Sequence, residues 1–346
     1  MGACSFLIQH GTAQEASGLL KQANLNRGIC CVLGSGDGSL PLDLAKHSEM
    51  LIHVLDPDAV AVKELRHRAD DDGFSIQRLL VEADGLGHLP HADNTLDLVI
   101  SNRPDVAGSL SVAEVLRALR PEGVAIFGGH DAQDTLQAWA GGVEVVKSWS
   151  DANGDWIQFL KPVPFGLGEW SHWEKSPDNN PVSEDTLIKA PYMTQFMARP
   201  WYIGMPAVTT VVGGRTFLAM GHIAHHEREW GALHRLLARN GYNGTILWER
   251  KLSEDYLVHR SAFIATKDTF FMINGDHCLL LDARTGEQKG KIPIADFPGG
   301  WKWIALHNGV LYALAGKPGD GVELVKGDRA LGGWSWADLS KGYYPK

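Results

Sequence analysis

The sequence has few of the features that would tie it to a membrane, a disulfide framework or nucleic acid. No run approaches the roughly 18 apolar residues of a membrane span, and the beginning, MGACSFLIQHG, is not a signal peptide. Four cysteines suit neither a disulfide framework nor a zinc site. Lysine and arginine total 32 against 41 acidic residues, so the net charge of −9 gives no attraction for phosphate backbones. We therefore expect a cytoplasmic protein with no nucleic-acid or membrane partner and no bound metal.

Tryptophan and tyrosine are missing from the first 138 residues, since all 12 tryptophans and 7 tyrosines lie at or after Trp139. That first part alternates apolar runs with helical patterns, in the order ICCVL, LPLDLAKH, LIHVLD, DAVAVKELRHRA, SIQRLLVEAD, TLDLVIS, VLRALRPEG and VAIFGG. TAQE and SVAE are capping boxes at helix starts. The alternation predicts an α/β Rossmann-like fold with a doubly wound, mostly parallel sheet. VEVVKSWS and DWIQFLKPV predict an antiparallel hairpin that closes it.

A glycine-rich loop follows the first apolar run, in CCVLGSGDGSLPLDLAKH. Its glycines permit a tight turn and a close approach of ligand to backbone, and the next helix offers unpaired N–H groups. The loop residues are Gly34, Ser35, Gly36 and Gly38. The dinucleotide fingerprint would need a glycine at Ser39, so the spacing differs from it. Asp56 ends the second strand, where a carboxylate can accept hydrogen bonds from a ribose diol.

These segments together resemble the class I S-adenosylmethionine-dependent methyltransferases over about residues 11–163. VLGSGDG is similar to the family's cofactor loop, VLDPD to its ribose-binding strand end, and EADGLGHLP to its adenine-binding segment. LDLVIS and EVLRALRPEGVAIF are similar to its later blocks. The resemblance implies that S-adenosylmethionine is the cofactor. It implies that the glycines lie under the methionine moiety, that Asp56 holds the ribose, that Asp84 and Gly85 frame the adenine, and that Ser101 also belongs to the cofactor site.

The sequence does not name the methyl acceptor. SNRPD follows the fourth strand, in place of the Asn/Asp-Pro-Pro-Tyr segment typical of amino-group methylases of adenine or glutamine. His88, His91 and Asn102 are expected on loops near the cofactor and could contact an acceptor, although solvated loop residues are the alternative interpretation. Alignment of the acceptor with the methyl group can supply most of the catalysis, so no catalytic base is implied.

The second part of the chain is predicted to be all β. Its apolar runs are divided by Gly, Asn and Asp turns, and the turn glycines Gly244 and Gly286 lie 42 residues apart. The pattern, clearest in LLLDARTGEQKGKI, resembles blades of pyrroloquinoline-quinone-type β-propellers, and the whole resembles bacterial fusions of a methyltransferase domain to such a propeller. We assign 1–163 to the first domain, 164–206 to a linker that leads into the second, and 207–346 to incomplete blades.

The second part has room for three to four blades, fewer than a usual closed ring. We therefore expect a fragment of a longer chain, or self-association through open sheet edges. The histidines of HIAHHEREWGALH suit a solvent-exposed segment between blade strands better than a metal site. The adjacent Cys30 and Cys31 suit core packing better than a vicinal disulfide.

The sequence is compatible with three functions. The first is a methyltransferase whose propeller recruits a substrate or partner. The second is a non-catalytic binding or scaffold protein with a degenerate methyltransferase fold. The third is a quinone-dependent dehydrogenase, which is disfavoured because no calcium-binding acid cluster is visible.

Overall fold

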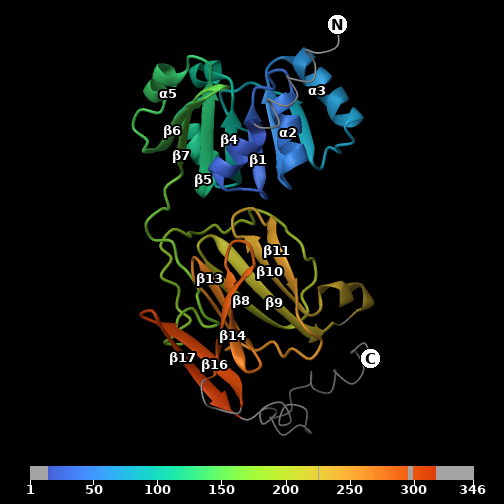
Figure 1. Cartoon of the computed structure of the whole chain (residues 1–346), viewed down its shortest axis with the longest axis vertical. Helices are drawn as coiled ribbons and strands as arrows, with labels where there is room; N and C mark the ends of the chain where they lie inside the picture. Colours follow the sequence, from blue (N-terminus) through green and yellow to red (C-terminus); the bar gives the residue numbers. More distant parts are fainter. Residues whose placement is uncertain (1–14, 225, 295–298, 317–346) are drawn as a thin grey trace. The chain divides into compact units, whose positions relative to one another are not determined.

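The computed structural model describes residues 15–224, 226–294 and 299–316. The chain divides between Phe165 and Gly166 into two compact units (Figure 1). The expected boundary at residue 163 lies two residues before this division. Among the described residues, no helix has the length and hydrophobicity needed to cross a membrane.

The first unit is built on one seven-stranded sheet with the order β3-β2-β1-β4-β5-β7-β6. Its strands are β1 (Ile29–Leu33), β2 (Leu51–Asp56), β3 (Leu79–Ala83), β4 (Leu96–Ser101), β5 (Leu119–Gly129), β6 (Val145–Asp151) and β7 (Gly154–Leu160). The first five strands pair in parallel, whereas β7 pairs antiparallel with both β5 and β6. The predicted mostly parallel Rossmann-like sheet with a closing hairpin is therefore confirmed.

Helices cover both faces of this sheet, as Figure 1 shows. They are residues 15–23, α2 (Ser39–His47), α3 (Ala59–Asp71), the 3-10 helix η1 (Pro104–Gly108), α4 (Val112–Ala118) and α5 (Gln133–Trp139). Residues 15–23, α2 and α3 share one hydrophobic core, while η1, α4 and α5 share the other. Cys30 belongs to the first core and Cys31 to the second, because successive side chains of a strand point to opposite faces. Both are free thiols, as expected for core packing.

The predicted caps are formed in part. The Ser111 hydroxyl accepts a hydrogen bond from the Glu114 N–H at 3.2 Å, as a capping box requires. The Glu114 carboxylate, however, accepts from the Leu89 N–H and from Arg117, so it does not close the box. α4 ends at Ala118 and Leu119 already begins β5, so the helical pattern expected through RPEG is wrong there. The TAQE box lies largely outside the described residues.

The described residues of the second unit form two four-stranded antiparallel sheets and a two-stranded one. The first sheet has the order β11-β10-β9-β8, the second β12-β13-β14-β15, and the last pairs β16 with β17. The bounds are β8 (Met205–Val212), β9 (Arg215–Ile223), η2 (Glu227–Ala232), β10 (Arg235–Asn240), β11 (Ile246–Lys251), β12 (Phe263–Ala265), β13 (Thr269–Asn274), β14 (His277–Asp282), β15 (Gln288–Pro293), β16 (Gly300–His307) and β17 (Val310–Gly316).

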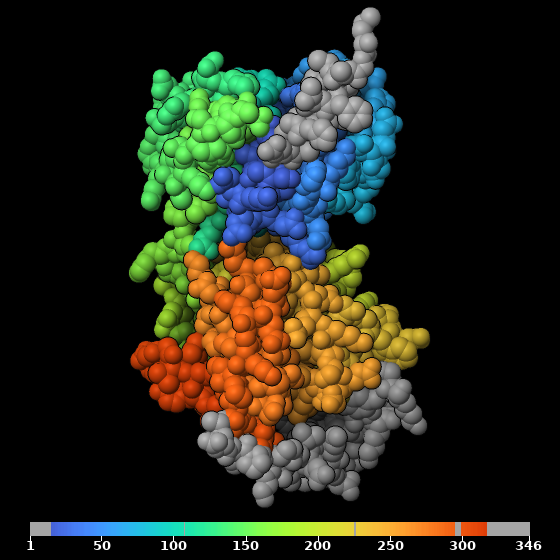
Figure 2. Space-filling model, viewed as in Figure 1, coloured from blue at the N-terminus to red at the C-terminus, as the bar shows by residue number. Residues whose placement is uncertain are grey.

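The two four-stranded sheets share one hydrophobic core, in which Phe217 stacks on Phe270 with ring centroids 4.9 Å apart. Trp248 on β11 joins them, because its indole N–H donates to the carbonyl of Ala283 at 3.2 Å. In Figure 2 the orange residues of the second sheet form much of the visible face of this unit. The predicted β structure of the second part is thus confirmed as antiparallel sheets, while the propeller itself stays a prediction.

Candidate functional site

The candidate site lies where the strand order of the first sheet reverses. β1 pairs with β2 on one side and with β4 on the other, so the chain leaves β1 and β4 in opposite directions. A crevice opens at the carboxyl ends of the strands at such a switch point, and α/β proteins bind ligands there. The glycine loop follows β1 and the SNRPD segment follows β4. Topology alone therefore brings these two segments to one place.

The glycines of the loop adopt conformations that side chains rarely tolerate. Gly34, Gly36 and Gly38 have φ values of 78°, 56° and 78°. A Cβ at Gly34 would lie 2.8 Å from the side chain of Arg103, whereas among the described residues the nearest atom to a Cβ at Gly36 would be 3.8 Å away. Gly38 is the N-cap of α2 and provides no side-chain cap, and the N–H of Ser39 in the first turn donates to the Asp37 carboxylate at 2.9 Å. The exposed backbone at Gly36 thus forms an open cradle.

Asp56 holds the glycine loop in place through hydrogen bonds. One carboxylate oxygen accepts hydrogen bonds from both the N–H and the hydroxyl of Ser35, each at 2.6 Å. The other oxygen accepts from the Asp58 N–H at 2.8 Å. Burial alone would raise the pKa of Asp56, but these hydrogen bonds and the nearby Arg103 outweigh it and hold the pKa below its usual value. Asp56 is therefore a buried, ionised anchor of the loop, and its contact with a ribose stays a prediction.

Arg103 lies against the loop, a position that the sequence analysis did not assign to it. Its guanidinium is 3.8 Å from the Asp56 carboxylate and forms a two-pronged ion pair with Asp105, with distances of 2.6 and 3.2 Å. Hydrogen bonding to Asp105 raises the pKa of Arg103, so the charge is permanent. The sequence signal that could have identified Arg103 is its position, two residues after a strand that ends at the switch point.

Ser101 and Asn102 join the two segments of the crevice. The buried Ser101 hydroxyl donates to the carbonyl of Leu33 at 2.6 Å, which ties the end of β4 to the end of β1. Asn102 lies beside Gly36 and shares a hydrogen bond with Glu15. Burial raises the pKa of Glu15, a second residue that the sequence analysis missed. Ser101 is thus a structural tie, while its contact with a cofactor stays a prediction.

Asp84 and Gly85 follow β3 and are exposed. The Asp84 N–H donates to the carbonyl of Asp56 at 3.1 Å, which places this segment next to the end of β2. The Asp84 carboxylate accepts from the Gly85 N–H at 2.7 Å and remains accessible for a further donor. The geometry suits the expected adenine contact, which stays a prediction.

The two loop histidines contact other elements. His88 is 75% exposed, and its ring nitrogen lies 2.7 Å from the Glu114 carboxylate on α4. His91 lies 3.0 Å from His53 on β2, which in turn is 2.9 Å from Glu82. Burial, with His53 and Arg117 nearby, lowers the pKa of His91 to about 4. None of these contacts involves the glycine loop, so an acceptor-side role for either histidine stays a prediction.

Comparison with known proteins bears on this same segment. Residues 31–123 match the family model described as "Methyltransferase domain". The first unit contains a methyltransferase domain. Its predicted membership of the S-adenosylmethionine-dependent class is confirmed by this match, which also supports S-adenosylmethionine as the cofactor. The match covers the glycine loop, both strand-end aspartates and the SNRPD segment, and less than half of the chain.

Ribosomal protein L11 methyltransferases from two serovars of Leptospira interrogans are 31% identical over 93 residues. The aligned part is 27% of this chain, and it spans only 31% of the length of those relatives.

Solved structures with a similar fold include a methyltransferase of Methanococcus maripaludis, described as S-adenosylmethionine-dependent (20% identity, 45% of this chain and 87% of that chain, TM-score 0.38). Another is an O-methyltransferase of Thermotoga maritima (12% identity, 44% and 66%, TM-score 0.39). A third is the magnesium protoporphyrin IX methyltransferase of Synechocystis with bound S-adenosylmethionine (14% identity, 44% and 79%, TM-score 0.36).

Proposed function

We propose that this chain transfers a methyl group from S-adenosylmethionine to an acceptor, and that the first unit carries the reaction. The observation that carries the proposal is the glycine loop at the switch point, held by Asp56 and open above Gly36. The residues present fit the cofactor, because the cradle accepts a close ligand and an ionised carboxylate lies beneath it. The family match over residues 31–123 supports the same function.

Each part of the site has a place in the proposal. The loop backbone at Gly36 would lie against the methionine moiety, and Asp84 would receive the adenine amino group. The cofactor supplies a methyl group on a sulfonium, which is a good leaving group. The protein then has mainly to align the acceptor with the methyl group and exclude competing geometries.

Arg103 adds a specific expectation about the methionine moiety. Its cation lies beside Gly34, and its closest ion-pair partner is Asp105, which has 63% of its side chain exposed, while the Asp56 carboxylate is 3.8 Å away. The carboxylate of the methionine moiety is an anion that would enter next to this cation. We infer that Arg103 holds that carboxylate, and that Asp105 is its partner when no cofactor is bound.

A second candidate function follows from the same arginine. In the structure Arg103 lies over part of the loop, and a protein that no longer uses its cofactor could keep it there. This would be a binding or scaffold protein with a degenerate methyltransferase fold. In either case, the second unit would recruit a partner or substrate through its β structure.

Two measurements on the full chain separate these functions. Calorimetric titration with S-adenosylmethionine tests the cofactor, and transfer of labelled methyl groups to a cell extract tests the reaction. Binding with transfer supports the methyltransferase, and binding without transfer supports the scaffold. The Gly36→Val variant, which should not bind the cofactor, is the negative control for both measurements. No binding to the folded wild-type chain would exclude the proposed function.

A further inference from the structure

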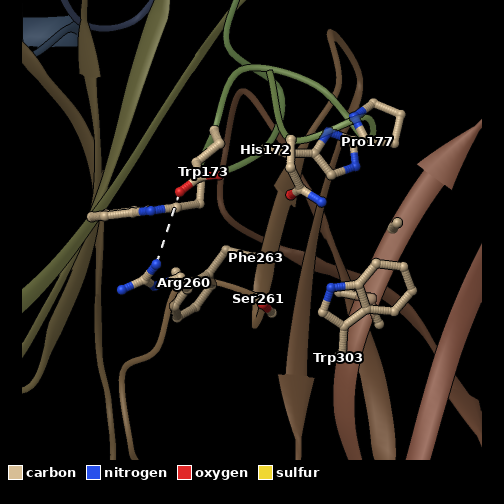
Figure 3. Close-up of a pocket in the computed structure, with 11 residues that line it drawn as sticks. His172, Trp173, Pro177, Arg260, Ser261, Phe263 and Trp303 are labelled. Carbon is tan, nitrogen blue, oxygen red and sulfur yellow. Dashed lines mark ion pairs between the residues drawn. The ribbon is translucent and has the colours of Figure 1, made fainter. Parts of the chain in front are cut away.

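The second unit contains a pocket that is lined by none of the residues of the candidate cofactor site. Three segments line it: residues 172–179, residues 260–263 before and at the start of β12, and residues 303–305 of β16. Its volume is about 250 Å³, and Figure 3 shows the side chains around it. The first of these segments was predicted to be a linker, yet it forms a wall of the pocket.

Hydrogen bonds hold this wall in position. His172 is 8% exposed, and its Nε2 accepts from the Leu306 N–H of β16 at 3.1 Å. The proton must then lie on Nδ1, which is 2.7 Å from the Ser171 hydroxyl. Burial lowers the pKa of His172, so the ring is neutral at pH 7. The carbonyl of Ser171 accepts from the Ala265 N–H at 2.9 Å, so the wall is attached to two strands and the pocket is preformed.

Two tryptophans line the pocket. In Figure 3 Trp173 lies on the left and Trp303 on the right, with Phe263 between them in this view. Both indoles are partly exposed, whereas Phe263 is buried. A flat aromatic surface packs well against the C–H face of a sugar ring, since that face is apolar and its edges are polar.

A loosely held ion pair supplies the polar side of the pocket. The Arg260 guanidinium is 3.8 Å from the Glu174 carboxylate, longer than the roughly 2.7–2.9 Å of a charge-assisted hydrogen bond. The guanidinium also lies over the Trp173 ring, 5.7 Å from its centroid. Each partner therefore keeps hydrogen-bonding capacity while the pair stays neutral as a whole. A donor beside an acceptor matches a vicinal diol, in which each hydroxyl can donate or accept.

We propose that this pocket binds one pyranose ring of a neutral carbohydrate. Aromatic walls would take the C–H faces, and Arg260 with Glu174 would take two adjacent hydroxyls. The volume is just below the about 300–1,000 Å³ of pockets for drug-sized ligands, which suits a single ring. The balanced charge disfavours phosphate or carboxylate ligands. This proposal does not depend on the methyltransferase function.

Saturation-transfer NMR on the full chain tests the proposal. The probes are the methyl glycosides of glucose, galactose, mannose and N-acetylglucosamine at millimolar concentration, with methyl glucuronide as the charged comparison. We expect transfer to the ring C–H protons of at least one neutral glycoside. Trp303→Ala and Glu174→Gln should each weaken its binding about tenfold or more. Trp230→Ala and Glu287→Gln, which change exposed side chains outside the pocket, should leave it unchanged.

Three results would overturn the proposal: no transfer from any neutral glycoside, transfer from methyl glucuronide alone, or undiminished binding to the Glu174→Gln variant. Glu174→Gln keeps the shape of a partly exposed side chain, so it decides the matter even if Trp303→Ala fails to fold. Near-ultraviolet circular dichroism checks the folding of every variant.

Discussion

The Asp56 carboxylate accepts two hydrogen bonds from Ser35, one from its backbone N–H and one from its hydroxyl, both at 2.6 Å. The residue expected to hold the ribose is therefore already bound to the loop that would carry the rest of the cofactor. Its 1% exposure leaves it little direct access to a ligand. Two roles can now be separated by experiment, a direct contact with the ribose and the positioning of the loop.

A double-mutant cycle distinguishes these roles. If Asp56 positions the loop, Ser35→Ala and Asp56→Asn should each weaken S-adenosylmethionine binding by about 1.5–3 kcal/mol, and the double variant should lose little more. Calorimetry gives the affinities. If Asp56 instead contacts the ribose directly, its replacement costs more than that of Ser35 and the two losses add.

The role of Arg103 can be tested with two ligands. S-adenosylhomocysteine carries the amino-acid carboxylate, and 5′-methylthioadenosine lacks it. Arg103→Ala should weaken binding of the first by about tenfold or more, because a charge-assisted hydrogen bond is lost. It should not weaken binding of the second. An Arg103→Ala variant that binds both ligands more tightly would show that this side chain obstructs the site.

Gly36→Val should abolish cofactor binding and leave most of the fold intact. The residue has φ 56°, where a side chain costs about 1–2 kcal/mol of folding stability, and a branched side chain would fill the cradle. Gly73→Val is the matched control, since Gly73 has φ 78° and no atom of a described residue would lie within 4 Å of its Cβ. Titration and thermal unfolding of both variants check the prediction. Normal binding by Gly36→Val would place the cofactor elsewhere.

His91 should make the free energy of unfolding depend on pH. Its pKa is about 4 in the folded chain and about 6.5 when unfolded, so the unfolded state binds more protons between these values. Stability should be fully present above pH 6.5 and fall as the pH is lowered toward 4. Allowing for partial exposure, the loss from this residue is about 2 kcal/mol. Urea unfolding at several pH values measures it. His91→Asn should flatten this part of the profile, and an unchanged profile in this variant would contradict the prediction.

Trp248 should be important for packing between the two four-stranded sheets. It is 6% exposed, and a Cβ at Gly286 would lie 2.6 Å from its ring. Trp248→Ala should destabilise the second unit by about 3–5 kcal/mol. Gly286→Ala should also destabilise it, and by more than Gly309→Ala, because Gly309 has a similar φ of 76° and no atom of the described part of the chain would lie within 4 Å of its Cβ. Equal losses for the two glycine variants would contradict the proposed contact.

The parts predicted from sequence are those that depend on local patterns. The run LIHVLD predicts β2, and the glycines after ICCVL predict a turn with positive φ, because no other residue adopts it at so little cost. The partner of Asp56 could not be predicted in this way. Whether its carboxylate meets Ser35 or a ligand depends on how β1 and β2 are paired, which no local pattern contains. Arg103 was missed because its role depends on the meeting of two segments about 70 residues apart.

In the second unit, too, local patterns predict the strands and turns but not the contacts between distant segments. Turn residues such as those around Gly244 and Gly286 mark where strands end, and the sheets follow from them. The segment around His172 has no helical or alternating pattern, so it reads as a linker. It becomes a pocket wall only through hydrogen bonds to residues more than ninety positions further along the chain, such as Ala265 and Leu306.

The placement of Cys30 and Cys31 provides two separate thiol probes for local opening of the first unit. The neighbouring thiols have no exposed surface and point into opposite cores, and burial raises the pKa of each. A thiol reagent can therefore reach each thiol only when the helices that cover its face of the sheet separate from the sheet by local unfolding. The rates at which Cys30→Ser and Cys31→Ser variants are labelled would report the opening of each layer separately, from positions one peptide bond apart.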